Sequence, residues 1–234
     1  MRSLSRRRHG AVRQACHAAR RGARPVGRRT AEPRAGDRPR VLGILPRRTA
    51  SAGAYIGWMN PAKAYDYLSR SRVKVLDAVR SLTPEQYERR FAFGLNTIGR
   101  TLTHTMVSEW YYVERLLQRQ VPPYEQWPIQ DEQPPAFAVI DETWRAQAPR
   151  TRAAIEAERD WSRRVGWDGF ADEQGRRFRV AATAGDLLAQ LLFHEVHHRA
   201  QVMAMLREIG PPASPVEDID YNAMMFERTP LVER

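Results

Sequence analysis

Cysteine is nearly absent from this chain of 234 residues, since Cys16 is the only one. A single cysteine excludes an intramolecular disulfide. Its position also leaves residues 59–234 without a thiolate ligand for a zinc site. Chains without disulfides are typical of a reducing compartment, so we expect a cytoplasmic protein.

Long apolar runs are also missing from the sequence. A membrane-spanning helix requires ~20 consecutive apolar residues, and no stretch approaches that length. The first residues include several arginines, but no apolar segment follows them as it would in a secretory signal. We therefore expect no membrane partner.

Acidic residues are scarce in the first quarter of the chain, which explains the formal net charge of +11. Residues 1–58 hold 15 arginines against two acids, and residues 59–234 hold 23 basic against 25 acidic residues. The composition of this first segment, rich in Arg, Gly and Pro, is typical of a disordered extension. It fits a tail that binds nucleic acid through charge, a targeting segment, or a coding start placed too early. We favour the last, because a helix start follows Met59 directly. We expect nucleic acid as a partner only if residues 1–58 are part of the natural protein.

Apolar residues recur at helical spacing in four segments of residues 59–225. Caps, prolines and glycines place these helices at about 61–81, 97–120, 137–159 and 187–209. A capping box before Pro84 predicts a short additional helix or turn. Pro149 predicts a kink or a break in the third long helix.

Two connections between the predicted helices differ in character. Residues 121–136 hold five prolines and predict an extended linker. Residues 164–180 alternate Val, Trp and Phe between glycines and predict a small hairpin or irregular excursion before the last helix. The sequence thus predicts an all-α four-helix bundle over residues 59–225, followed by a frayed tail at 226–234. We expect two of its helices to form a homodimer interface as well.

The last predicted helix carries two histidines in the middle of an apolar stripe. The stripe consists of Leu187, Leu191, His194, His198, Val202, Met205 and Ile209. Imidazoles at positions i and i+4 project to the same side and can hold one divalent metal ion. The alternative is a pair of buried, hydrogen-bonded histidines. His197 lies on another side of this helix, with Gln190 and Gln201, and is expected to flank the site or face solvent.

Several motifs together resemble those of the DinB/YfiT-like superfamily. The last helix carries HEVHHRAQ at residues 194–201 and ends in LREIG at 206–210. The second helix opens with NTIGRTLTH at residues 96–104, with Glu109 five residues further on, and DIDY follows at 218–221. The resemblance covers about residues 60–225 in order and spacing.

This resemblance implies a metal centre in a four-helix bundle. Carried over residue by residue, it adds His104 of the second helix to His194 and His198 as metal ligands. Taken alone, His104 would be an ordinary surface or core histidine. Three histidines with an open fourth position are the arrangement of a catalytic site. Three imidazoles suit zinc, nickel, iron or copper, and zinc and nickel are the metals that we expect first.

The resemblance also implies a reaction class. Some members of the superfamily use a low-molecular-weight thiol such as mycothiol or bacillithiol in transfer or isomerisation reactions. We therefore expect a thiol-dependent S-transferase or isomerase that acts on a small-molecule substrate. A metal-binding or ligand-binding stress-response protein without catalysis is the alternative, and a DNA-associated protein acting through the basic tail is a third class.

Glu195 raises a further alternative, because residues 194–198 also read as the H-E-x-x-H pattern of zinc proteases. In that pattern the glutamate is the general base, which makes Glu195 a candidate catalytic residue. A zinc protease normally takes its third ligand downstream, but no histidine follows His198. Glu195 can equally support a metal ligand from behind or be a partner between helices, and a pair with Arg199, one turn later on its own helix, is one example. Proteolysis is therefore the minor alternative.

Overall fold

The computed structural model describes residues 59–169, 174–210, 216 and 219–228. The expected extension at 1–58 lies outside the described residues, and of the expected tail only 226–228 are described. The chain divides into two units, one formed by residues 1–51 with 169–178 and the other by 52–168 with 179–234. All elements and the site discussed below belong to the second unit.

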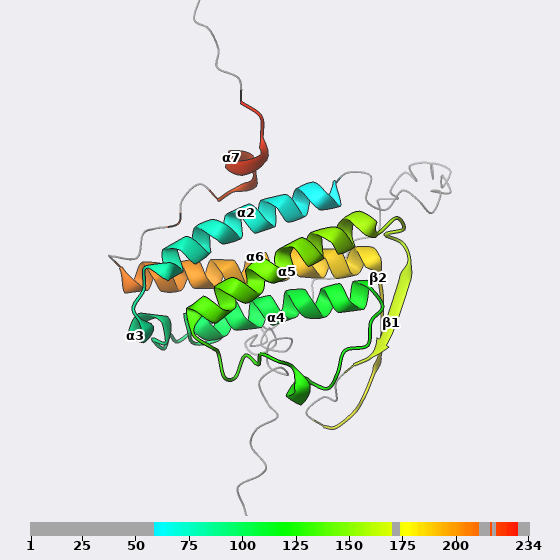
Figure 1. Cartoon of the computed structure of the whole chain (residues 1–234), viewed down its shortest axis with the longest axis horizontal. Coiled ribbons are helices and arrows are strands. Elements are labelled where there is room, and N and C mark those ends of the chain that lie inside the picture. Colours follow the sequence, from blue (N-terminus) through cyan, green and yellow to red (C-terminus); the bar gives the residue numbers. More distant parts are fainter. Residues whose placement is uncertain (1–58, 170–173, 211–215, 217–218, 229–234) are drawn as a thin grey trace, which may run out of the picture. The chain divides into compact units, whose positions relative to one another are not determined.

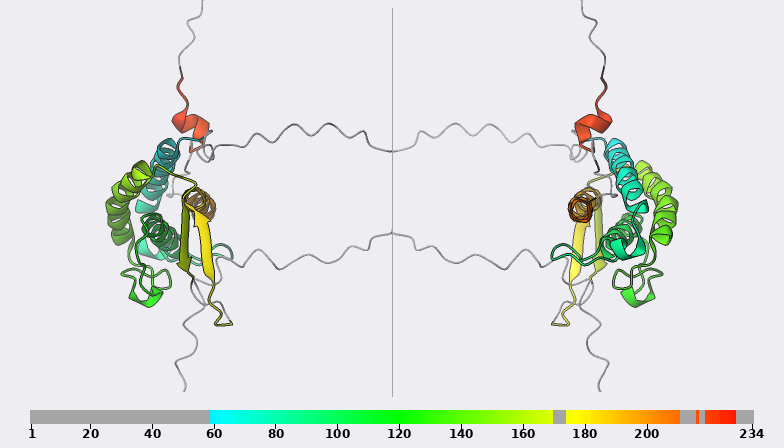
Figure 2. Two further views of the ribbon diagram at one scale, coloured as in Figure 1. Left: turned by 90° about the vertical axis from the view of Figure 1, so that its right-hand side faces the viewer. Right: turned by 90° about the vertical axis from the view of Figure 1, so that its left-hand side faces the viewer.

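The second unit is a bundle of long helices, as the sequence predicts (Figure 1). In chain order its elements are α2 (Pro61–Arg80), α3 (Pro84–Tyr87), α4 (Ile98–Leu116), η1 (Tyr124–Gln126), α5 (Phe137–Ala157), β1 (Arg164–Asp168), β2 (Arg179–Thr183), α6 (Ala184–Ile209) and α7 (Tyr221–Met225). Helices α2 and α4 each pack against both α5 and α6. Figure 2 shows the four long helices close to end-on. Among the described helices, none is both long and apolar enough to cross a membrane.

The first long helix begins at residue 61, as predicted, and the last begins at Ala184, three residues before the predicted start at 187. The side-chain oxygen of Asn60 accepts a hydrogen bond from the backbone N–H of Lys63 at 3.0 Å and caps α2. Thr183 caps α6 and forms a reciprocal capping box with Asp186. Helix α6 stops at Gly210, whose φ of 71° lies in the region that glycine adopts at little cost.

The excursion before α6 is a hairpin. Strands β1 and β2 pair antiparallel, with Arg164 opposite Thr183 at the open end and Asp168 opposite Arg179 at the other. The strand end at Thr183 is also the cap of α6, so the hairpin leads directly into the helix with the histidines.

Two predicted helix features differ in the structure. Helix α4 ends at Leu116 rather than near Gln120. Helix α5 continues through Pro149, so of the predicted kink or break the break is absent. Proline has no N–H, so the backbone carbonyl four residues before Pro149 lacks its helical hydrogen bond. Pro149 is exposed, so water can hydrate this carbonyl instead. The buried side chains of Trp144 and Thr151 hold the helix on either side of it.

Charged side chains, rather than apolar ones alone, occupy the centre of the bundle. Arg72 of α2 donates to both carboxylate oxygens of Glu195 on α6, at 2.9 and 2.5 Å, and to Glu109 of α4 at 2.6 Å. All three residues are at most 5% exposed. Burial alone would lower the pKa of Arg72, but the charges of Glu109 and Glu195 raise it well above its ordinary value. This network therefore links three helices through one fixed positive charge.

Helix α5 joins the same network through Glu109. The Trp144 indole N–H donates to Glu109 at 2.7 Å, and the Thr151 hydroxyl donates at 2.6 Å. Tyr65 of α2 donates its hydroxyl to the same carboxylate at 2.7 Å. Each carboxylate oxygen of Glu109 is thus hydrogen-bonded, which offsets the cost of burying its charge.

The segment after α6 packs against α2. The Tyr67 hydroxyl donates to the backbone carbonyl of Ile219 at 2.9 Å, and the rings of Tyr67 and Tyr221 lie 5.1 Å apart. Arg199 of α6 donates to the Tyr67 hydroxyl at 2.8 Å, so the same tyrosine connects α2, α6 and the segment around α7.

Replacing Arg72 tests the energetic weight of the network. We expect Arg72→Met to lower the free energy of unfolding by about 3–5 kcal/mol, because it leaves two buried carboxylates without their counter-charge. Urea denaturation measures this loss. Arg145→Met is the matched control, since Arg145 pairs with Asp141 one turn away but its side chain is 69% exposed. That control should change stability by no more than about 0.5 kcal/mol. Equal effects of the two substitutions would contradict the account.

Candidate metal centre

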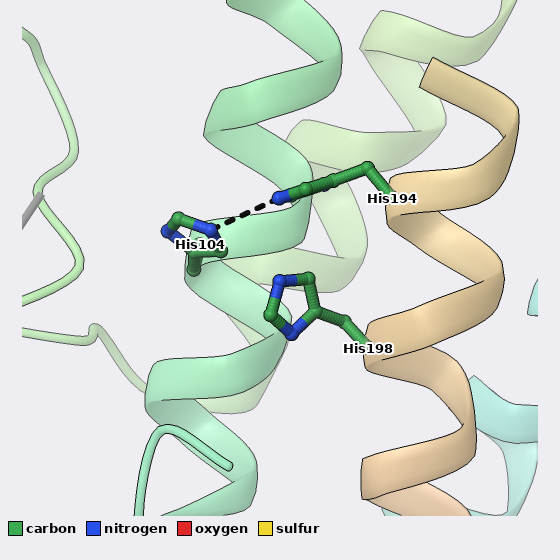
Figure 3. A group of neighbouring side chains, drawn as sticks. All are labelled: His104, His194 and His198. Atoms are coloured by element: carbon green, nitrogen blue, oxygen red, sulfur yellow. Dashed lines mark hydrogen bonds between the residues drawn. The ribbon is translucent and has the colours of Figure 1, made fainter. Parts of the chain in front are cut away.

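Three imidazoles from two facing helices converge at one point. His104 comes from α4, and His194 and His198 come from successive turns of α6 (Figure 3). One ligand nitrogen from each lies within 4.8 Å of the other two. The Nε2 atoms of His104 and His194 are 3.1 Å apart. His104 and His198 are buried, and His194 is half-buried. The structure thus brings together all three histidines that the sequence singled out.

The spacing of these nitrogens suits a single small cation. Two imidazole nitrogens bound tetrahedrally to an ion at ~2.0–2.1 Å would lie about 3.3 Å apart. The observed Nε2 separation of 3.1 Å between His104 and His194 is close to that value. The ring centroids of His194 and His198 are 4.5 Å apart, and that of His104 lies within 5.0 Å of both. The three ligand nitrogens, all within 4.8 Å of one another, are therefore close enough together to hold one divalent metal ion.

Two of the imidazoles have a hydrogen-bond partner at Nδ1, the nitrogen that faces away from the other histidines of the cluster. Nδ1 of His104 lies 3.2 Å from a carboxylate oxygen of Asp131. Nδ1 of His198 lies 2.9 Å from the side-chain oxygen of Gln201. Sequence reasoning assigned neither partner to the site. Gln201 sits three residues after His198, a spacing that could have indicated the contact, whereas Asp131 lies in the proline-rich linker, where no periodicity points to it.

The imidazoles of α6 are poor bases in the metal-free protein. Burial, together with the neighbouring histidines, lowers the pKa of His194 to about 2. Burial and the charge of His104 lower the pKa of His198 to about 4. Both are therefore neutral at neutral pH, and a neutral imidazole is the form that binds a metal ion.

The remaining two residues of the motif have other surroundings. His197 is exposed, as expected, and its ring packs against that of His198 at 4.9 Å. The side-chain amide of Gln201 lies 3.0 Å from His197 Nε2. The carboxylate of Glu195 is 4% exposed and is held by Arg72 in the central network. A general-base role for Glu195 stays a prediction. Its contacts favour the alternative of a partner between helices, although the partner is Arg72 rather than Arg199.

A separate cavity of about 220 Å³ lies between α4, α5 and the segment around residue 128. Trp110, Trp127 and Met106 line it, with Gln147 and Arg150 among its few polar residues. None of the three histidines contributes to this lining. This cavity is therefore separate from the cluster of imidazoles.

The fold and the site define a class, a helical-bundle protein with a three-histidine group suited to one metal ion. The sequence model of the DinB family matches residues 57–229, and the chain belongs to this family. The predicted resemblance is thus confirmed. A solved structure of a DinB-like protein from Bacillus cereus is similar, with 20% identity, a TM-score of 0.47, and coverage of 66% of this chain and 93% of that one. A comparison with curated proteins gave no match.

The lowered pKa values predict how stability depends on pH. An unfolded histidine takes up a proton near pH 6.5, but His194 and His198 resist protonation in the folded, metal-free protein. The unfolded chain then binds more protons, so the free energy of unfolding should fall as the pH drops below about 6.5 and continue to fall toward pH 4. Urea denaturation in the presence of a chelator measures this dependence.

A variant isolates the contribution of these two imidazoles. His194→Gln combined with His198→Gln removes both groups and should flatten the pH dependence between pH 7 and 5. His197→Gln, which changes an exposed histidine of the same helix, should leave it unchanged. Parallel curves for the double variant and the wild type would contradict the assignment.

Proposed function

We propose that the protein binds one divalent metal ion through His104, His194 and His198 and uses it in a thiol-dependent transfer or isomerisation of a small-molecule substrate. The observation that carries this proposal is the convergence of three imidazole nitrogens within 4.8 Å between two facing helices. The reaction class rests on the resemblance to superfamily members that use a low-molecular-weight thiol. Zinc and nickel are the metals that we expect first.

The chemistry of this donor set supports catalysis over a purely structural role. Structural zinc sites usually have four protein ligands, whereas three leave one position for a water, a thiol or a substrate. A bound ion of this kind supplies a Lewis acid that keeps a thiol deprotonated near neutral pH. The chain contributes neutral imidazoles, and the central network holds α4 and α6 at a fixed spacing.

The contacts of Glu195 weaken the protease alternative. A zinc-protease glutamate must act as a base on a metal-bound water. Here Arg72 occupies both carboxylate oxygens of Glu195. The third histidine comes from α4, upstream of the motif, rather than from a downstream segment. We infer that Glu195 holds α6 against α2.

The homodimer and the cytoplasmic location remain predictions from the sequence. Phe193 and Val196 lie one turn apart on α6 and are 70% and 39% exposed. They are apolar side chains that a second copy of the chain would cover.

Metal analysis tests the centre directly. The full-length chain, purified without an added polyhistidine tag, should hold about one zinc or nickel ion per chain after equilibration with that metal. His104→Ala and His198→Ala should each lose it, because two remaining imidazoles hold an ion far more weakly. His197→Ala is the matched control, since this histidine neighbours His198 but is absent from the cluster. Equal metal content in all four proteins, or none in the wild type, would overturn the proposal.

An activity assay tests the reaction class. The metal-loaded protein should accelerate conjugation of a low-molecular-weight thiol to a model electrophile, and His198→Ala should lose that acceleration with its circular dichroism unchanged. Bacillithiol and mycothiol are the thiols to compare, with glutathione beside them. Stoichiometric metal without thiol transfer by any of them would favour the alternative, a metal-binding protein without catalysis.

A further inference from the structure

The proline-rich connection between α4 and α5 is more than a linker. It contains the turn η1 and places two side chains in the interior, Trp127 at 8% exposed and Asp131 at 1% exposed. A carboxylate so deeply buried requires partners that offset the loss of its hydration. The partners of Asp131 are therefore informative about its role.

Asp131 has a partner for each carboxylate oxygen. Oδ2 lies 3.2 Å from Nδ1 of His104, and Oδ1 accepts a hydrogen bond from the Tyr124 hydroxyl. The backbone N–H of Asp131 donates back to the Tyr124 oxygen at 3.0 Å. These contacts hold the Asp131 carboxylate in one orientation, with one oxygen facing the His104 ring.

A carboxylate accepts hydrogen bonds, so the contact with Asp131 places a proton on Nδ1 of His104. In the neutral imidazole this leaves the lone pair on Nε2, the nitrogen that points at His194. In metalloproteins a carboxylate on the far nitrogen of a histidine fixes both the tautomer and the ring orientation.

We propose that Asp131 is the positioning residue of the metal centre, turning Nε2 of His104 toward a divalent cation. This inference rests on the metal site of the proposed function. Gln201 serves His198 in the same way, through its side-chain oxygen. His194 differs from both, because within the described part of the chain its hydrogen bond is to His104 Nε2 alone.

This difference assigns the tautomers of the metal-free centre. His104 Nε2 has the lone pair, so His194 must donate its Nε2–H across the 3.1 Å separation. To bind a cation, His194 therefore has to give up the proton on Nε2 so that its lone pair faces the ion. The rings of His104 and His198 are already oriented by Asp131 and Gln201. The connection between α4 and α5 thereby acts on the site through one carboxylate.

Zinc affinity, measured by competition with a chromophoric chelator, tests the role of Asp131. Asp131→Asn should bind zinc ~10–100-fold more weakly than the wild type. The matched control is Glu132→Gln, which changes the next residue. Glu132 is exposed and accepts from the same Tyr124 hydroxyl, but it does not contact His104. The control should stay within about twofold of the wild type. Equal affinities of the wild type and Asp131→Asn would overturn the inference, and absence of zinc binding in the wild type would instead overturn the proposed function.

A second measurement uses the wild-type protein and needs no substitution. Long-range ¹H–¹⁵N correlation spectra of the metal-free chain at neutral pH report the tautomer of each imidazole. We expect the Nδ1–H form for His104 and the Nε2–H form for His194. The Nε2–H form at His104 would overturn the inference, even if Asp131→Asn failed to fold.

Discussion

The ion pair of Arg72 with Glu109 and Glu195 is the interaction on which the rest of the structure depends. It is buried among four helices, and α5 adds two hydrogen bonds to the same centre. Glu109 lies five residues after His104 on α4, and Glu195 follows His194 directly on α6. A shift or rotation of either helix would separate these charges in a medium of low dielectric constant, where separation is costly. The network therefore fixes the faces that α4 and α6 turn toward each other, and with them the spacing of the imidazoles.

The proposed metal centre is thus held from two sides. On the inner side, the central network sets the helices at the spacing at which the Nε2 atoms of His104 and His194 lie 3.1 Å apart. On the outer side, Asp131 and Gln201 orient the rings of His104 and His198. Burial keeps the α6 imidazoles neutral, as a metal ion requires. A mobile pair of helices with the same three histidines would lack this preorganisation.

Much of this arrangement could be predicted from local sequence signals. Local signals placed the start of α2 and the end of α6 at Gly210, although α6 begins three residues before the predicted 187. The stripe of α6 identified His194 and His198, because such patterns depend on neighbours within one helix. His104 gained its place only through the family resemblance. Arg72 lies on the core stripe of α2 between Leu68 and Leu76, so the sequence could have indicated that this arginine is buried and paired with an acidic residue. It could not have indicated that the acidic partners are Glu109 and Glu195. Asp131 reaches the site through the tertiary path of an aperiodic connection, which no local pattern encodes.

The central claim is that one ion is bound by three imidazoles from α4 and α6. X-ray absorption spectroscopy of the zinc-loaded, full-length protein tests it most directly. The account predicts nitrogen and oxygen ligands at about 2.0–2.1 Å, with the outer-shell scattering of three imidazole rings. A shell with sulfur, or one whose outer scattering requires a single imidazole or none, would contradict it.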